Sequence, residues 1–302
     1  MKILITGAGG FIGKRLCQTL SEAGHELAAL ARDPQAARRS APALSAAFAW
    51  DALRQYAPRE AFDGVQAVIH LAGESVAGRW TAGKKKAIYD SRIQGTKHLV
   101  DTLATLDQKP ATLISASAIG YYGERGEDLL DEAQPPGRDF LAGVCKDWEA
   151  QTARAQALGV LRLVQLRTGI VLGPEGGALG ALLPLAKLGL SGPLGGGHQW
   201  WSWIHRDDAA GLIQHALNNP LTGPVNAVSP HPVRQREFAK TLGRALKRPA
   251  FLPAPALALK LVLGEFSSEL LSSKRVLPQK AQASGYAFKF AELEAALRQI
   301  LG

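Results

Sequence analysis

A glycine-rich turn at the start of the chain constrains the possible folds more than any other feature of the sequence. Residues 6–13 read TGAGGFIG, after the apolar run Lys2–Ile5, which is typical of a buried strand, and before the helical pattern Lys14–Glu22. Three glycines at this spacing are a weak signal alone. Between a strand and a helix they predict a βαβ unit whose first turn binds a dinucleotide.

The chemistry of such a turn accounts for its residues. A tight turn favours glycine, the backbone must come close to the pyrophosphate, and the helix must pack closely against the strand. The N–H groups at the start of the helix, at the positive end of its dipole, then stabilise the phosphates. We therefore expect cofactor contacts from Gly7, Gly10, Phe11, Ile12 and Gly13.

Short apolar runs alternate with helical patterns through the first half of the chain, as in parallel sheets covered by helices on both faces. The expected strands are Lys2–Ile5, Glu26–Ala31, Ala46–Trp50, Ala67–Leu71, Thr112–Ser115 and Leu163–Arg167. The expected helices are Lys14–Glu22, Ser91–Thr105 and Val144–Ala157. The sequence thus predicts an α/β fold, a Rossmann doubly wound parallel sheet, over residues 1–173.

From about Pro174 glycine and proline recur, and helical patterns end the chain. These helices are expected at Arg236–Leu246, Ala254–Gly264, Phe266–Lys274 and Ala291–Leu301. Residues 174–302 are predicted to form a smaller, mainly helical domain on the substrate side. Trp201–Asn218 and Pro224–Val228 are expected to pack back on the Rossmann domain.

Composition narrows the function classes. The net charge is +9, and residues 231–302 hold twelve basic and five acidic residues, a net charge of +7. These cations alternate with apolar residues, as on the wet side of a helix, so we expect a solvated surface and neither nucleic acid nor a membrane as partner. Two cysteines, no signal peptide and no long apolar run predict a cytoplasmic protein. We expect no metal site.

The end of the second expected strand bears on the choice between NAD and NADP. An acid there would bind the ribose 2′-hydroxyl of NAD, but this chain has Ala31 followed by Arg32, whose charge suits a 2′-phosphate. Asp33 is expected to start a turn. NADP is therefore the predicted cofactor. Asp51, after the third strand, either accepts a hydrogen bond from the adenine amino group or caps a turn.

The fourth expected strand ends in small residues that let the backbone pass close to the nicotinamide ribose. His70, just before this end, is interpreted as a hydrogen-bonded core residue. Cofactor contacts are expected from Leu71, Ala72 and Gly73.

Several motifs together resemble the extended short-chain dehydrogenase/reductases, in the branch of sugar-nucleotide epimerase-like proteins with a distinct C-terminal domain. They are 6–13, HLAGE at 70–74, SRIQGT at 91–96, SASAIGYYG at 115–123, CKDWE at 145–149, LRTGIVLG at 166–173 and WSWIHRDD at 201–208. Residues 264–265, 275–278 and 285–288 extend the resemblance over essentially the whole chain. It implies an NADP-dependent oxidoreductase or epimerase, a small-molecule substrate such as a nucleotide sugar, and a possible homodimer.

The resemblance also implies a catalytic Ser, a Tyr and a Lys four residues after that Tyr, of which only Ser117 is retained. Tyr121 and Tyr122 are the nearest phenols that can replace the missing one, or they pack in the core. We expect Tyr122 to face the cleft and Tyr121 to face the core. Lys146 either binds the cofactor ribose or lies on the helix surface. In a second register, which aligns Glu149, the lysine position falls on Cys145.

Three further segments have open interpretations. Arg167 either binds an acid in the core or faces the ligand. Two of Trp200, Trp201 and Trp203 are expected to pack in the core, and one to stack on a substrate ring. Asp207 or Asp208 is expected to cap the helix that follows.

Two functions remain at this stage. The first is an NADP-dependent oxidoreductase or epimerase acting on a small molecule. The second is a non-catalytic NADP-binding sensor or scaffold, since such proteins keep the glycine turn and lose the Tyr–Lys pair. Fold alone does not decide between them.

Overall fold

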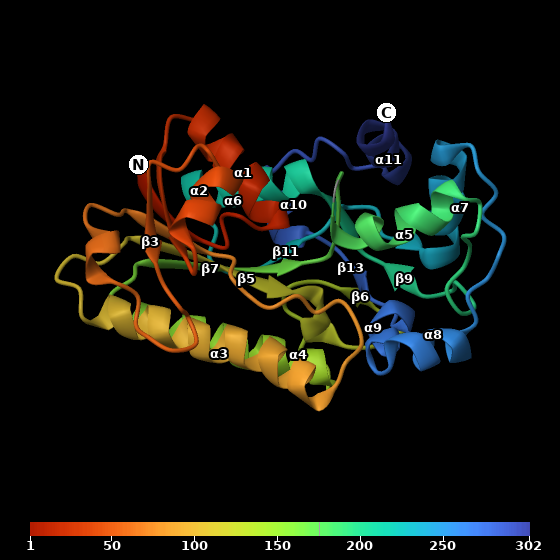
Figure 1. Ribbon diagram of the computed structural model, residues 1–302, viewed down its shortest axis with the longest axis horizontal. Coiled ribbons are helices and arrows are strands. Elements are labelled where there is room, and N and C mark those ends of the chain that lie inside the picture. The colour runs from red at the N-terminus through yellow and green to blue at the C-terminus, as the bar shows by residue number, and fades with distance from the viewer. Residues whose placement is uncertain (175) are drawn as a thin grey trace.

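A seven-stranded parallel sheet runs through the computed structural model, which describes residues 1–174 and 176–302 (Figure 1). The strand order is β11-β7-β5-β4-β1-β2-β3. From β1 the sheet extends through β2 and β3 on one side and through β4, β5, β7 and β11 on the other, as in Rossmann sheets. Sheets of this kind bind ligands at the carboxyl ends of the strands where the order reverses, which here is beside β1. The strands are β1 (Lys2–Thr6), β2 (Glu26–Ala31), β3 (Ala46–Ala49), β4 (Ala67–His70), β5 (Thr112–Ala118), β7 (Arg162–Thr168) and β11 (Gly223–Ala227).

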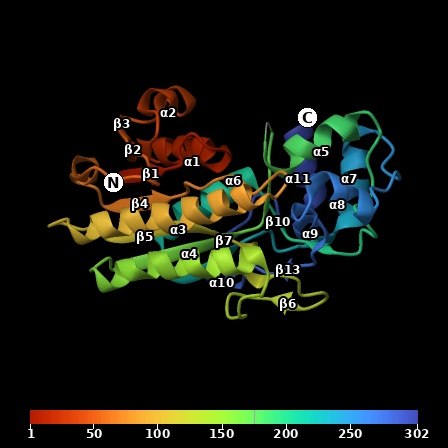
Figure 2. The same ribbon diagram turned by 60° about the horizontal axis from the view of Figure 1, so that its bottom comes forward.

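Helices cover both faces of this sheet, so the expected doubly wound α/β fold is confirmed (Figure 2). On one face lie α1 (Phe11–Glu22), α2 (Pro34–Ser40), α6 (Arg206–Asn218) and α10 (Gln279–Ala283). On the other lie η1 (Arg59–Phe62), α3 (Ala82–Ala104) and α4 (Phe140–Ala157). Successive strand side chains point to opposite faces, so Ile3 and Ile5 pack under α1 while Leu4 packs under α3.

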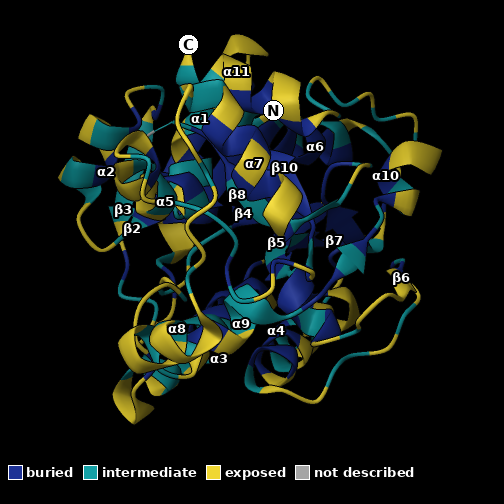
Figure 3. Ribbon diagram, turned by 90° about the vertical axis from the view of Figure 1, so that its right-hand side faces the viewer, coloured by how far each residue is buried: buried dark blue, intermediate teal, exposed yellow. Residues whose placement is uncertain are grey.

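A second, mainly helical region lies beyond the carboxyl ends of the strands (Figure 1). Its helices are α5 (Gly177–Lys187), α7 (Gln235–Leu246), α8 (Ala256–Leu263), α9 (Phe266–Leu271) and α11 (Leu293–Leu301). Its strand pairs are β8 (Ile170–Leu172) with β10 (Trp203–His205), β9 (Trp200–Trp201) with β12 (Val233–Arg234), and β6 (Leu129–Leu130) with β13 (Arg275–Val276). Trp203 and Phe238 are fully buried in its own core. Viewed from this side, α8 is exposed over most of its length, with Leu259 and Leu263 half-buried (Figure 3).

Two helices begin earlier than expected, because polar caps outweigh the hydrophobic pattern at their starts. Thr81 accepts a hydrogen bond from the N–H of Lys84, so α3 starts at Ala82 rather than Ser91. Asp139 does the same for the N–H of Ala142 and starts α4 at Phe140 rather than Val144.

The expected cap of α6 was wrong. His205 occupies the cap position, and its Nδ1 accepts from the N–H of Asp207 at 3.0 Å. Asp207 instead pairs with Arg15 of α1 at 2.8 Å. Asp208 is fully buried and accepts hydrogen bonds from the backbone N–H groups of Lys289 and Phe290 at 2.8 and 2.9 Å. Tertiary partners thus take both carboxylates away from the helix start.

Within residues 1–174 and 176–302 there is no helix both long and apolar enough to cross a bilayer. The same part of the chain holds no cluster of three or more His, Cys, Asp and Glu side chains arranged to bind a metal ion.

Replacing Asp208 tests how the C-terminal segment is attached to the sheet. Asp208→Ala leaves two part-buried backbone N–H groups without an acceptor, and should lower the free energy of unfolding by about 3 kcal/mol in urea titrations. Asp207→Ala is the matched control: its ion pair with Arg15 is partly exposed, so a loss of about 1 kcal/mol or less is expected. Equal losses would mean that Asp208 does not hold this segment.

Candidate functional site

The glycine turn packs so tightly that two of its glycines exclude any side chain. Gly7 has a φ of +75°, and a Cβ there would lie 2.9 Å from the carbonyl carbon of Leu71 at the end of β4. A Cβ on Gly13 would lie 2.1 Å from the carbonyl oxygen of Gly7. Gly10, the N-cap of α1, is less crowded, with 3.1 Å to the same oxygen. Gly13 therefore faces its own turn rather than a phosphate.

The start of α1 suits an anion. Glycine at the N-cap provides no side chain to bind the N–H groups of the first turn, and that turn contains no acid. Phe11 and Ile12 therefore present backbone donors at the positive end of the helix dipole. The Arg206 guanidinium lies 5.2 Å from the Phe11 ring centroid. Within the described ranges the buried Nε of Arg206 has no hydrogen-bond partner. The residues present thus fit a dinucleotide pyrophosphate.

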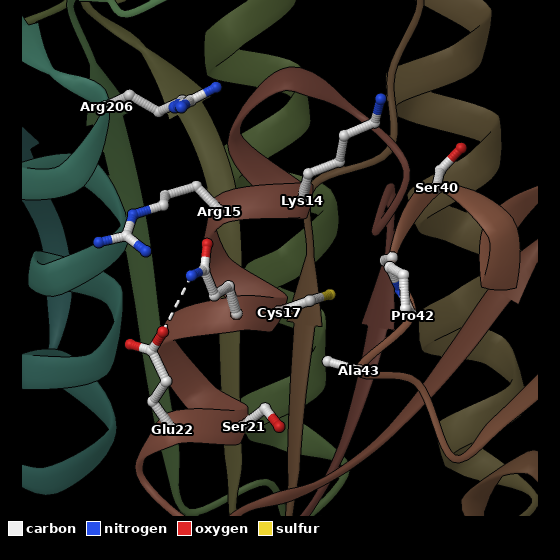
Figure 4. A pocket seen from close by; sticks show the side chains of 11 residues that line it. Lys14, Arg15, Cys17, Ser21, Glu22, Ser40, Pro42, Ala43 and Arg206 are labelled. Atoms are coloured by element: carbon white, nitrogen blue, oxygen red, sulfur yellow. Dashed lines mark hydrogen bonds between the residues drawn. The ribbon is translucent and has the colours of Figure 1, made fainter.

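A basic groove of about 410 Å³ follows the outer side of α1 (Figure 4). Lys14 and Ser40 flank one end of it, and Arg15 and Arg206 lie on the opposite side. Arg15 is paired with Asp207, so Lys14 and Arg206 are the cations that remain near the start of the helix. Sequence analysis missed Arg206 as a site residue, because only folding brings α6 beside α1.

At the adenosine end of the cleft, Arg32 is exposed directly after β2. Asp33 caps α2, accepting from the N–H of Ala36 at 2.9 Å, as the expected turn required. Asp51 accepts from the N–H of Leu53 at 3.1 Å, so its carboxylate caps a turn in this structure. Both carboxylates at this end are therefore bonded to backbone N–H groups, whereas the Arg32 side chain is exposed.

A buried hydrogen-bond chain joins β1, β4 and α3. His70 Nδ1 lies 2.7 Å from Thr6 Oγ1, and its Nε2 lies 3.0 Å from Thr96 Oγ1. Thr6 Oγ1 also accepts from the N–H of Ala72 at 3.1 Å, which fixes the backbone of the expected cofactor contacts 71–73. Burial lowers the pKa of His70 to about 4. His70 is thus the neutral core residue that the sequence predicted.

Arg92 of α3 provides a cation beside Gly73 that sequence analysis did not single out. Its Nη1 donates to the carbonyl oxygens of Glu74 and Ile88, at 2.9 and 3.2 Å. Its Cζ lies 5.0 Å from the Trp148 ring centroid, and would lie 3.3 Å from a Cβ on Gly73. The motif at 91–96 contained this residue, but only the packing of α3 against the end of β4 shows where its charge lies.

A buried ion pair lies at the carboxyl ends of β5 and β7. Arg167 donates from Nε and Nη2 to the two carboxylate oxygens of Glu149, both at 2.8 Å. Burial opposes the charge, but the bonds to Glu149 raise the pKa of Arg167 above its ordinary value. Ser117 Oγ donates to the same carboxylate at 2.7 Å. Of the two interpretations of Arg167, the structure has the one in which it binds a core acid.

Tyr122 lies in the core and not at the cleft where it was expected, while Tyr121, expected to face the core, packs partly buried against the same cluster. Tyr122 is fully buried, with its hydroxyl donating to Asn226 Oδ1 at 2.6 Å and accepting from Arg167 Nη1 at 3.1 Å. Burial raises the pKa of Tyr122 to about 12. Tyr121 is half-buried, and the Arg167 Cζ lies 3.5 Å from its ring centroid. The prediction that Tyr122 faces the cleft was wrong, because Asn226 of β11 binds its hydroxyl inside the core.

The α4 face that meets the end of β5 carries Leu141, Cys145 and Glu149. A Cβ on Gly120 would lie 3.2 Å from Leu141 Cβ and 3.8 Å from Cys145 Sγ. Burial raises the pKa of this thiol to about 12, so it stays neutral. Lys146 is exposed on α4. Cys145 is thus the α4 residue that lies near the end of β5, as the second register supposes, and Lys146 has the surface position that was its alternative interpretation. The contact of Lys146 with the cofactor stays a prediction.

The tryptophans separate as expected into two core residues and one other. Trp201 and Trp203 are buried. Trp200 is half-buried, with the guanidinium carbons of Arg234 and Arg275 at 4.1 and 4.3 Å from its ring centroid. Arginines therefore occupy the ring that was expected to stack on a substrate.

Comparison with known proteins places these features in a family. Residues 3–228 match the NAD dependent epimerase/dehydratase family, and residues 254–300 match a domain of unknown function, DUF1731. The chain is 39% identical over its whole length to a chloroplastic epimerase family protein SDR39U1 homolog of Arabidopsis thaliana, covering 87% of it. It is 36% identical to epimerase family protein SDR39U1 of Homo sapiens, with both chains covered completely.

Solved structures agree. Human SDR39U1 (isoform 2) with NADPH has a TM-score of 0.89 and 35% identity, over 100% of this chain and 99% of that one. A nucleoside-diphosphate sugar epimerase of Corynebacterium glutamicum has a TM-score of 0.80 and 33% identity, over 100% and 58%. UDP-glucuronic acid 4-epimerase of Bacillus cereus has the same TM-score at 19% identity, a likeness of fold alone.

The low pKa of His70 makes a prediction about stability and pH. The unfolded chain binds a proton at His70 near pH 6.5, but the folded chain does so only near pH 4. This contribution to stability is therefore complete above pH 6.5 and is lost as the pH falls toward 4. Between pH 7 and 5 the native protein should lose about 2 kcal/mol more than His70→Gln in urea unfolding. An identical pH dependence of the two proteins would contradict a neutral, buried His70.

Proposed function

The chain belongs to the NAD dependent epimerase/dehydratase family, and from that premise we propose that it binds NADP(H) and uses it to oxidise, reduce or epimerise a small molecule. The observation that carries the cofactor assignment is the end of β2, where Ala31 stands in place of an acid and Arg32 is exposed. The uncapped start of α1 and the Arg206 guanidinium support it at the pyrophosphate. The NADPH bound to the human relative supports it independently.

Arg32 should decide the preference between the two cofactors. A charge-assisted bond to the 2′-phosphate contributes about 1.5–3 kcal/mol, so Arg32→Ala should weaken NADPH binding about 10- to 100-fold and leave NADH binding unchanged. Arg38→Ala, another exposed arginine on the neighbouring α2, serves as the control. Calorimetric titrations with both cofactors make the measurement. Equal affinities for NADPH and NADH in the native protein would contradict the assignment.

For the chemical step we propose Ser117 and the two tyrosines as candidates, with different roles. Bound NADP(H) supplies the hydride chemistry, and the protein must provide a proton donor or acceptor. Tyr121 is half-buried, and is therefore the phenol that a substrate can reach. Tyr122 donates to Asn226 inside the core, and Ser117 donates to Glu149. We assign proton transfer to Tyr121, and positioning through the Arg167–Glu149 pair to Tyr122 and Ser117.

Substitution of the tyrosines separates these roles. Tyr121→Phe should lower kcat for reduction of an o-quinone or aldehyde about 10²- to 10⁴-fold, with NADPH affinity unchanged. Tyr122→Phe leaves Asn226 without its donor, and should mainly lower the free energy of unfolding, by about 1–2 kcal/mol. Full activity in Tyr121→Phe, Tyr122→Phe and Ser117→Ala alike would show that none of the three is catalytic.

A second function, a non-catalytic NADP(H) sensor, is favoured by a specific observation. The lysine position carries Cys145, whose pKa is raised by burial, and the Ser117 hydroxyl is bonded to Glu149. Incubation with NADPH deuterated at the reactive carbon and a metabolite panel distinguishes the two functions. Transfer of deuterium to a metabolite supports the enzyme, and retention of all deuterium on tightly bound NADPH supports the sensor.

A further inference from the structure

A cavity of about 700 Å³ lies between the helical region and the sheet domain. Its walls come from α8 and α9 on one side and from the N-terminal ends of α3 and α4 on the other. Figures 1 and 2 both show α8 and α9 beside those ends of α3 and α4. Segments more than a hundred residues apart in the sequence thus form one recess.

This cavity adjoins the candidate site through α4. Phe140 lines the cavity, and the next residue, Leu141, packs on Gly120 at the end of β5. Lys85 lines it as well, and Arg92 lies seven residues later in α3, on the same side of that helix. The cavity therefore shares α3 and α4 with the candidate site.

The apolar part of the lining consists of aromatic and aliphatic side chains. Trp80 and Phe140 meet edge to face with ring centroids 5.3 Å apart, and Phe266 lies 5.6 Å from Trp80 on another side. The Trp80 Nε1 donates to the carbonyl oxygen of Val76, so the indole adds no free donor to the cavity. Leu257 and Leu271 complete the apolar lining. Such walls favour a flat, apolar ring.

The charged groups at the cavity do not suit phosphates. Lys85 pairs with Glu265 at 2.6 Å, and Glu269 pairs with Lys274 at 3.0 Å. Lys260 is the remaining cation among the lining residues. The acids among them are Asp139, Glu265 and Glu269. A nucleoside diphosphate sugar brings about two negative charges, for which proteins supply arginines, lysines or free helix N-termini.

The starts of α3 and α4 at this cavity both carry side-chain caps. Asp139 caps α4 through the N–H of Ala142, and Thr81 caps α3 through the N–H of Lys84. Each cap satisfies a first-turn N–H group, and the carboxylate of Asp139 adds a negative charge. The start of α8, where Ala256 and Leu257 line the recess, has no side-chain cap. The charges still disfavour a diphosphate, because the described lining residues include three acids and two lysines, of which Lys85 is paired.

We propose that this cavity binds an uncharged aromatic ring compound and excludes nucleoside diphosphate sugars. The assignment of the cavity as the substrate site rests on the oxidoreductase function proposed above. The binding of an aromatic compound in the cavity does not depend on that function. Leu257 contacts the ligand from α8, whereas Leu261, one turn later on the same helix, lies outside the cavity. Their side chains are 70% and 68% exposed, so both tolerate substitution without a loss of folding.

The test measures binding of 2-acetylnaphthalene, an uncharged aryl ketone, to the full chain by ligand-detected NMR, with and without NADP⁺. A charge at Leu257 removes apolar contact, so Leu257→Asp should raise the Kd about tenfold or more, while Leu261→Asp leaves it unchanged. UDP-glucose should not displace the ketone. Circular dichroism confirms that both variants are folded.

Three results would overturn the proposal: no binding of the ketone, the same Kd in both variants, or displacement of the ketone by UDP-glucose. NADPH affinity, titrated in the same samples, is a separate readout. If NADPH fails to bind while the ketone shows the expected pattern, the oxidoreductase function fails and the cavity assignment stands. If NADPH binds and the ketone does not, the cavity assignment fails and the proposed cofactor binding stands.

Discussion

The buried ion pair between Arg167 and Glu149 is the interaction on which the centre of this molecule depends. It joins the end of β7 to α4, and through Ser117 and Tyr122 it reaches β5 and the Asn226 side chain of β11. Taking one partner away would leave a charge uncompensated in the core, at a cost of about 3–5 kcal/mol. The two hydrogen bonds between Arg167 and Glu149, and those to the hydroxyl groups of Ser117 and Tyr122, satisfy the polar atoms of the pair. The same bonds occupy these two hydroxyl groups and so limit their part in any reaction.

That limit explains why the site departs from the pattern its family resemblance implies. Ser117 and Tyr122 are both hydrogen-bonded to this ion pair, and the buried thiol of Cys145 on the neighbouring α4 stays neutral. The positive charges at the cleft come instead from Arg32, Arg92 and Arg206, each on a different element. A cofactor that carries phosphates meets cations and helix donors here, whereas the recess between α3, α4, α8 and α9 combines aromatic rings with more acids than lysines.

The helical region supplies the other half of that recess. It is attached to the sheet domain through the Asp208 carboxylate of α6, which accepts hydrogen bonds from the backbone N–H groups of residues 289 and 290. Its core, around Trp203 and Phe238, is separate from the two cores of the sheet. A rigid junction of this kind holds α8 and α9 at a defined position over the ends of α3 and α4.

Local patterns determined much of this protein. The glycine turn, the alternation of apolar runs with helical patterns, and the buried His70 were readable from the sequence, because each depends on residues close together in the chain or on a simple period. The Arg32 and Asp33 positions at the end of β2 were readable for the same reason. What tertiary structure decided was the partner of each polar side chain. Tyr122 is buried because Asn226, more than a hundred residues away, accepts its hydrogen bond, and Asp208 leaves the helix cap because the backbone at 289–290 needs an acceptor. Such choices depend on which distant groups meet in the core, where an unpaired polar group costs more than any local preference supplies.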